Sequence, residues 1–234
     1  MQLNEIKYLV YFEYIKNIRQ YLYDFEVYLK NKDLFSIQGL VVPISDEIEP
    51  NNPRLHIIKE FENKTINILI SQVSITVSIQ YKVNINLIQV DSELDFLNEV
   101  SKSIKTFFIS NIDKFNINFE SLSVVANKLY KNNDDITKVN VSQEQDEIRE
   151  RKSIEINDEL FFVDELNIFK TYELKTLQNN IIDLVRNKKE NFVGWNMVIV
   201  KEVNNRLSYN NDNDELFDFK KAKNLILKSY NEEQ

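Results

Sequence analysis

Apolar and polar residues alternate most clearly between Leu55 and Leu87. Ile66, Ile68 and Ile70 alternate with polar residues, and a second alternation begins after a one-residue slip at Gln72. The second series carries apolar side chains at Val73, Ile75, Val77, Ile79, Tyr81, Val83, Ile85 and Leu87. A period of two predicts strands, and one extra residue exchanges the two faces, so the slip indicates a turn or a bulge. We predict an antiparallel meander here, with another strand within residues 35–44.

The first thirty residues allow two interpretations. A spacing close to 3.6 predicts one long amphipathic helix over residues 3–29, with apolar side chains at Leu3, Ile6, Val10, Tyr14, Ile18, Tyr21, Phe25 and Leu29. The alternative is a strand followed by a helix, in which one strand face carries Ile6, Tyr8, Val10, Phe12 and Tyr14. We favour the helix because its period continues for about seven turns, whereas the alternation stops near Ile15.

The remaining pattern completes an α+β fold. Strands are predicted at 115–130, 154–163, 166–174 and 192–203, and helices at 92–108, 177–188 and 214–230. The polar stretch 131–152 is either a linker or the tip of a long hairpin, and we favour the hairpin because long structureless loops are uncommon. Strands followed by a helix occur twice, which predicts two antiparallel-sheet lobes, residues 1–130 and 153–234, together with the long N-terminal helix.

Glycine, histidine and cysteine are nearly absent. The chain of 234 residues has two Gly, one His and no Cys. Loops that cradle phosphate need several closely spaced glycines, and a structural zinc site needs four ligands that are mostly Cys or His. We therefore expect no cofactor and no metal of this kind. The start of the chain lacks a signal-peptide pattern and no apolar stretch is long enough to cross a membrane, so we expect a cytoplasmic protein.

The charge argues against nucleic acid as a partner. The net charge of −8 is divided equally between residues 1–120 and 121–234, so neither half is basic. A surface that binds nucleic acid would carry a basic half or stripe. We expect a protein partner or a homo-oligomer instead.

The order of elements resembles a known family. The segments NPRLHIIKEF, KTINILISQVSITVSIQY, NINFESLSVVANKLYKN and DELFDFKKAKNLILKSY follow one another as in a sporadically distributed bacterial family of uncharacterised, two-lobed α+β proteins of similar length. Where that family tends to carry glycine and arginine, this chain has Val124, Val125, Ala126 and Asn127. The resemblance implies a fold but no activity, cofactor or site residues.

Carboxylates are the main candidates for chemistry. Glu173 and Lys175 form a Glu-x-Lys triplet after Asp158 and Asp164, as in many metal-dependent nucleases that hold Mg²⁺. The same triplet occurs at Glu5 and at Glu62, close to the number expected by chance, so charged residues on a solvent face explain it as well.

A second acidic group precedes the last predicted helix. Asp212, Asp214 and Asp218 resemble the start of a calcium loop, but the glycine and the final glutamate of such a loop are missing. Acidic residues that stabilise the helix dipole account for this group without a metal. His56 is expected on a strand face, and Trp195, the only tryptophan, is expected to be a core or interlobe anchor.

Aromatic residues crowd the N-terminal segment on more than one face. A helix packed on one lobe needs a single apolar stripe, so the surplus indicates a second contact, either the other lobe or a partner. The partner-binding candidates are Tyr8, Tyr11, Phe12 and Tyr23. We therefore expect a non-enzymatic protein-interaction module, such as an accessory, antitoxin-like or phage-defence protein. The alternative is a metal-dependent phosphodiesterase or nuclease that uses Asp158 or Asp164 with Glu173 and Lys175.

Overall fold

One antiparallel sheet organises the protein. The computed structural model describes residues 2–32, 40–42, 45, 47–83, 87–113, 115–130, 147–156, 160–172, 192–205 and 217–231. Nine strands within these ranges form the sheet, in the order β2-β3-β4-β5-β1-β6-β9-β8-β7. Their bounds are β1 Gln2–Phe12, β2 Leu40–Val41, β3 Leu55–Glu60, β4 Lys64–Ile70, β5 Ser74–Tyr81, β6 Ile117–Tyr130, β7 Glu147–Ile156, β8 Leu160–Tyr172 and β9 Phe192–Asn204.

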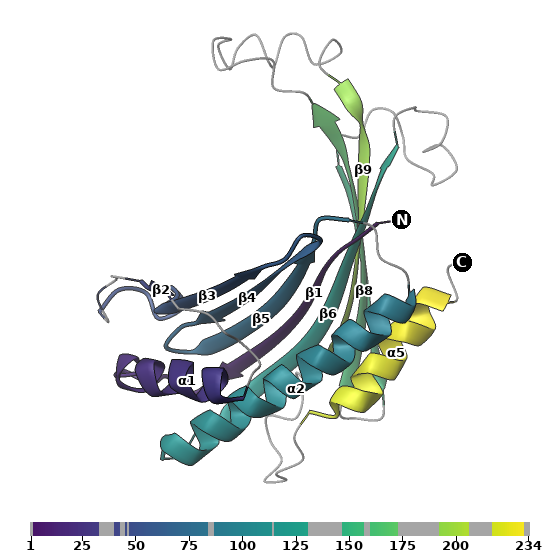
Figure 1. Cartoon of the computed structure of the whole chain (residues 1–234). Coiled ribbons are helices and arrows are strands. Elements are labelled where there is room, and N and C mark those ends of the chain that lie inside the picture. Colours follow the sequence, from purple (N-terminus) through teal and green to yellow (C-terminus); the bar gives the residue numbers. More distant parts are fainter. Residues whose placement is uncertain are drawn as a thin grey trace, which may run out of the picture.

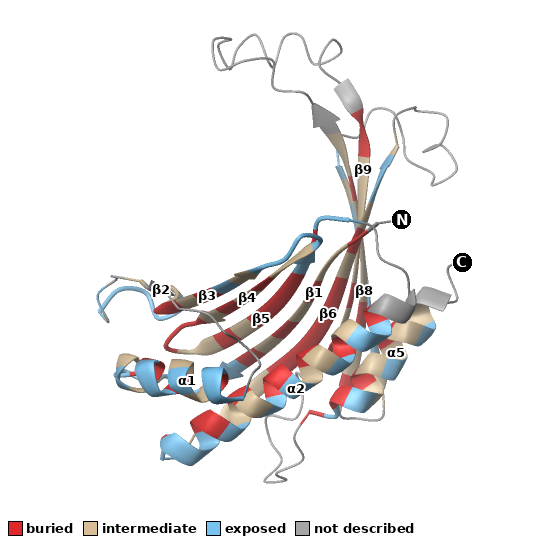
Figure 2. Cartoon of the chain, viewed as in Figure 1, coloured by how far each residue is buried: buried red, intermediate tan, exposed pale blue. Residues whose placement is uncertain are grey.

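All described helices lie on one side of the sheet (Figure 1). They are α1 (Arg19–Asn31), α2 (Leu87–Asn111) and α5 (Phe219–Asn231). We call the side of the sheet beneath them the covered face and the opposite side the open face. The strands carry alternate residues to the two faces, and the buried apolar residues of the central strands point to the covered face. Figure 2 shows this burial along β5, β1 and β6.

The predicted long N-terminal helix is wrong. Residues 2–12 form β1, a central strand that pairs with β5 on one side and with β6 on the other. Only the second part of the segment is helical, as α1, which buries Leu22, Phe25 and Leu29. The apparent period of 3.6 arose because the buried residues of a strand and those of a following helix were counted as one series. Residues 2–12 adopt the strand conformation because pairing along both edges of β1 satisfies its backbone donors and acceptors.

The two predicted lobes are also wrong, because β6 of residues 1–130 pairs with β9 of residues 153–234, and this pairing joins both parts into a single sheet. The strand predicted at 154–163 spans the end of β7 and the start of β8. The predicted hairpin tip, 131–152, divides between β7 and residues outside the described ranges. Its flanking strands β6 and β7 are not neighbours, since β9 and β8 lie between them. The helix predicted at 177–188 lies outside the described residues.

Several local predictions are confirmed. The slip at Gln72 is the turn between β4 and β5, closed by a 2.8 Å bond from the Ser71 amide to the Ser74 carbonyl. The helix predicted at 92–108 is α2, and its predicted apolar stripe is buried, namely Leu94, Leu97, Val100, Ile104 and Phe107. The strand predicted at 192–203 matches β9 within one residue.

The main core lies between the covered face and the helices. Its end near α1 is aromatic, where Phe25 contacts Phe107 and Phe108 at ring-centroid distances of 5.2 Å. Phe12 lies 4.9 Å from Phe115 in the same group. A second, smaller core surrounds Ile168 and Trp195, which are both 1% exposed. It lies where β9 and its neighbours project beyond the helices (Figure 1).

Candidate functional site

The open face is the side of the sheet that the described helices leave uncovered (Figure 1). Strand register assigns its central rows, because residues paired across neighbouring antiparallel strands share a face. One row runs Thr65, Gln80, Glu5, Val125, Val200 and Glu165; the next runs Asn67, Ser78, Lys7, Ser123, Glu202 and Val163; a third runs Leu69, Thr76, Leu9, Ser121, Asn204 and Phe161.

An apolar strip occupies the middle of this face. Val125, Val198 and Val200 are partly exposed and come from the neighbouring strands β6 and β9. Leu9 and Leu69 are partly exposed on the same face. Small hydroxyl residues separate them, and Ser121 and Ser123 are almost buried between larger neighbours. The result is a surface of methyl and hydroxyl groups, suited to contact with another apolar surface.

Two pairs of polar side chains on the open face are bonded to one another. The Asn204 amide donates to the Glu202 carboxylate at 2.7 Å, and the Gln80 amide donates to Glu5 at 3.3 Å. These bonds hold the long side chains close to the sheet. A surface whose polar groups are already ordered loses less entropy when it binds.

His56 lies toward the β3 side of the open face, as predicted for a strand-face histidine. Its Nε2 is 3.2 Å from Asn67 Oδ1.

The four aromatic partner-binding candidates separate in the structure. Tyr11 is 39% exposed on the open face, where its ring lies 5.9 Å from that of Phe119. Tyr23 is 74% exposed on α1, on the covered side of the sheet. Tyr8 and Phe12 are buried in the main core, because residues 8 and 12 of a strand share the face that the helices cover. They are not accessible to a partner.

Tyr8 belongs to a buried polar cluster on the covered face. Its hydroxyl donates to Glu120, which is 1% exposed, and Lys105 of α2 donates to the same carboxylate at 2.8 Å. The other carboxylate oxygen accepts the Phe217 amide at 3.3 Å. Burial, reinforced by the Glu120 charge and hydrogen bond, raises the pKa of Tyr8 well above its usual value. Three donors on β1, α2 and the segment before α5 thus converge on one strand residue, which fixes the helix layer to the sheet.

The residues of the predicted nuclease are not brought together among those described. Asp158, Glu173 and Lys175 lie outside the described ranges. Asp164, on β8, pairs with Lys201 of β9 at 3.3 Å. The Lys201 side chain is 3% exposed, so this carboxylate is engaged in balancing a buried charge.

The predicted calcium loop falls mostly outside the described residues, since Asp212 and Asp214 lie there. Asp218 is exposed immediately before α5, and its Oδ1 accepts the Lys221 amide at 2.9 Å. This is the geometry of a helix N-cap. Within the described ranges, no three acidic or histidine side chains are grouped so that they could hold a metal ion.

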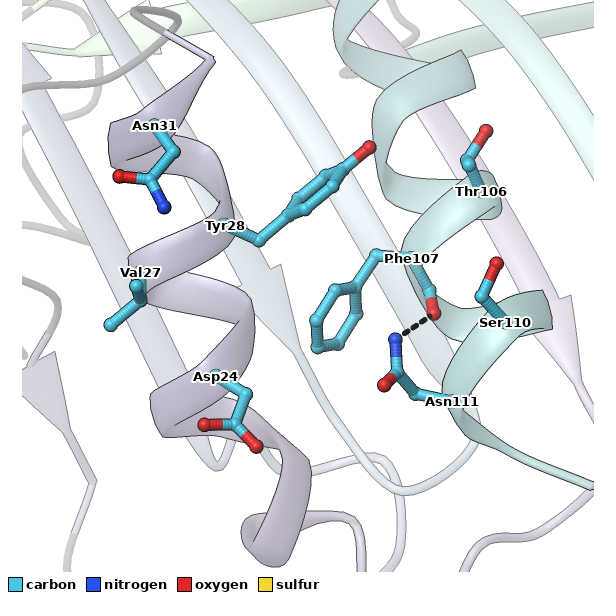
Figure 3. Close-up of a pocket in the computed structure, with 8 residues that line it drawn as sticks. All are labelled: Asp24, Val27, Tyr28, Asn31, Thr106, Phe107, Ser110 and Asn111. Atoms are coloured by element: carbon cyan, nitrogen blue, oxygen red, sulfur yellow. Dashed lines mark hydrogen bonds between the residues drawn. The ribbon is translucent and has the colours of Figure 1, made fainter.

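A shallow groove of about 380 Å³ lies between α1 and α2 (Figure 3). Tyr28 and Phe107 line its middle, and their ring centroids are 5.3 Å apart. Its polar lining comes from both helices, with Asp24 and Asn31 on α1, and Thr106, Ser110 and Asn111 on α2. The Asn111 amide bonds to the Phe107 carbonyl at 2.8 Å, so part of this lining is engaged within α2.

The valines of the open face were missed by the sequence reasoning. The segment Val198–Val203 carries apolar residues at most positions, but from the sequence we singled out only Trp195 in this strand. An apolar run on both faces of a strand is the signal for a second contact. Trp195 itself is buried as expected, with the Lys170 ammonium 5.0 Å from its ring.

Comparison with protein-family models, curated protein sequences and solved structures finds no match to this chain. The described helices include none with the length and apolar character needed to span a membrane.

Proposed function

We propose that this chain is a non-enzymatic protein-interaction module that acts in the cytoplasm and binds its partner through the open face. The observation that carries the proposal is the strip of Val125, Val198 and Val200, which is partly exposed on a face without a described helix above it. Apolar side chains surrounded by ordered polar groups are typical of the centre of a protein interface.

Charge defines the partner further. The chain carries a net charge of −8, and Glu5, Lys7 and Glu202 lie beside the apolar strip on the open face. A protein with an apolar surface and a net positive charge would be attracted at long range and then packed at short range. A partner of this kind fits an accessory or antitoxin-like protein that masks a basic protein. We also propose that the chain is related to the sporadically distributed bacterial family that its order of elements resembles.

A photo-crosslinking amino acid tests this proposal in the native host. It is placed at Val200 on the open face and, as a matched control, at Thr106, which is exposed on α2. We expect one basic protein to be linked covalently from position 200 and not from position 106. A second change, Val125→Lys, should abolish that adduct while the far-ultraviolet circular dichroism spectrum stays unchanged.

Two outcomes would contradict the proposal. Equal labelling from positions 200 and 106 would show that capture is non-specific. No adduct from position 200 would remove the open face as the contact surface.

A further inference from the structure

The strand β7 forms one edge of the sheet. It pairs with β8 along its whole length, from Glu147 to Ile156, and no described strand lies on its other side. The opposite edge is β2, which is only two residues long. A long edge strand presents a row of backbone donors and acceptors that another strand can pair with. The two edges therefore differ, and only β7 is long enough to extend the sheet.

The residues of β7 are arranged symmetrically about Arg151. On the covered-face side, Ile148 and Ile154 lie three residues before and after it, and Glu150 and Lys152 lie one residue before and after it. Two copies of β7 paired antiparallel about Arg151 therefore place Ile148 opposite Ile154 and Glu150 opposite Lys152, each twice. Ile154 is 59% exposed in the single chain and would be covered in this arrangement.

We infer that β7 pairs with β7 of a second copy of this chain, which gives a two-fold dimer with one continuous sheet. A contact of this kind is isologous and closed, so it does not propagate into a fibre. It involves the sheet edge and does not depend on the open-face partner.

The opposite side of β7 accommodates the same pairing. Arg151 faces its own copy at the two-fold axis. Glu165 of β8 offsets this repulsion, because its carboxylate forms ion pairs with Arg151 at 3.8 Å and with Arg149 at 2.9 Å. The like charges of Glu147 and Glu155 meet only at the two ends. Moving the two-fold axis to residue 150 would place Glu150 opposite its own copy and Arg149 opposite Arg151 twice, and like charges directly opposite disfavour that register. Charge therefore favours the register centred on Arg151 over the one centred on residue 150.

The test is a charge exchange measured on the full chain by sedimentation equilibrium. Glu150→Lys and Lys152→Glu each convert two opposite-charge contacts into like-charge contacts, so we expect each to weaken dimerisation by about tenfold. The double variant restores opposite charges and should return dimerisation to within about twofold of the wild type. An equimolar mixture of the two single variants should form a heterodimer.

Controls separate this contact from a general effect of charge. Lys220→Glu, on an exposed position of α5, changes the net charge as Lys152→Glu does and should leave dimerisation unchanged. All three positions are exposed, so circular dichroism should show an unaltered fold. A wild-type chain that remains monomeric at every concentration, single variants that dimerise normally, or a double variant that fails to recover would each overturn the inference.

Discussion

Two buried tyrosines on the covered face should respond in opposite ways to loss of the hydroxyl. Tyr8 is fully buried and donates its hydroxyl to the Glu120 carboxylate. Tyr81 is 8% exposed, and its hydroxyl is buried without a hydrogen-bond partner among the described residues. Burial, together with the charge of Glu93, raises the pKa of Tyr81, so this hydroxyl stays neutral. Replacement by phenylalanine removes one oxygen in each case and leaves the ring packing in place.

The expected magnitudes follow from what each hydroxyl contacts. A hydrogen bond to a charged group contributes about 1.5–3 kcal/mol, so Tyr8→Phe should lower the free energy of unfolding by that amount. We expect a loss in the lower half of this range, because Lys105 and the Phe217 amide still contact Glu120 after the Tyr8 hydroxyl is removed. Tyr81→Phe removes a buried hydroxyl that gains nothing in the folded state, so the change should lie between zero and about 1 kcal/mol of stabilisation.

Urea unfolding measures the difference. Far-ultraviolet circular dichroism and the fluorescence of Trp195, the only tryptophan, provide two independent probes, and the two transitions should coincide. The midpoint should fall for Tyr8→Phe and not for Tyr81→Phe, with the denaturant dependence unchanged in both. Equal losses for the two variants, or no loss for Tyr8→Phe, would refute the contribution assigned to the Glu120 cluster.

Three further predictions concern charged side chains. A hydrogen bond from Asn167 and the positive charge of Arg149 hold the pKa of Glu165 below its usual 4.5, so its contribution to stability is present above pH 4.5 and lost as pH falls through the lowered pKa. Glu165→Gln should make the acid-induced loss of stability smaller in a pH series of urea titrations.

For Lys223, partial burial lowers the pKa, but bonds to Asp91 and Asp95 raise it above 10.5 overall, so its contribution is complete below pH 10.5 and lost as pH rises through the raised pKa. Lys223→Met should therefore reduce the loss of stability at alkaline pH, measured as the free energy of unfolding against pH. An unchanged alkaline loss would contradict this. Arg54 is fully buried and donates to the Asn52 and Ile48 carbonyls at 2.6 and 2.8 Å. Arg54→Met should lower the free energy of unfolding, measured by calorimetry, by at least about 2 kcal/mol, since each of the two orphaned acceptors costs about 1–3 kcal/mol.

Local periodicity predicted the correct secondary structure wherever a strand or helix buries only one of its faces. The hairpin of β4 and β5 alternates cleanly around Gln72, and α2 carries its stripe from Leu94 to Phe107. Each pattern arises from contact with a single neighbouring layer, so the sequence contains the whole signal. The open face was harder to find, since Val198 and Val200 lie in a strand with apolar residues on both sides.

The N-terminal segment shows what the sequence could not decide. Residues 2–12 fit a helix by spacing and a strand by alternation, and nothing within the segment distinguishes the two. Pairing with β5, about seventy residues away, and with β6, about 115 residues away, gives β1 its structure. A further long-range pairing, of β6 with β9, joins the two predicted lobes into one sheet.

The sequence by itself determined which kinds of chemical site the chain can form and most of its individual helices and strands. Two glycines, one histidine and no cysteine exclude loops and metal sites that depend on those residues, whatever the fold. Only the tertiary structure decided which surfaces remain available, because exposure depends on where the helices pack. Tyr8 became part of a buried cluster and Val200 part of an open surface. Both outcomes follow from strand pairing across the whole chain, which local sequence does not encode.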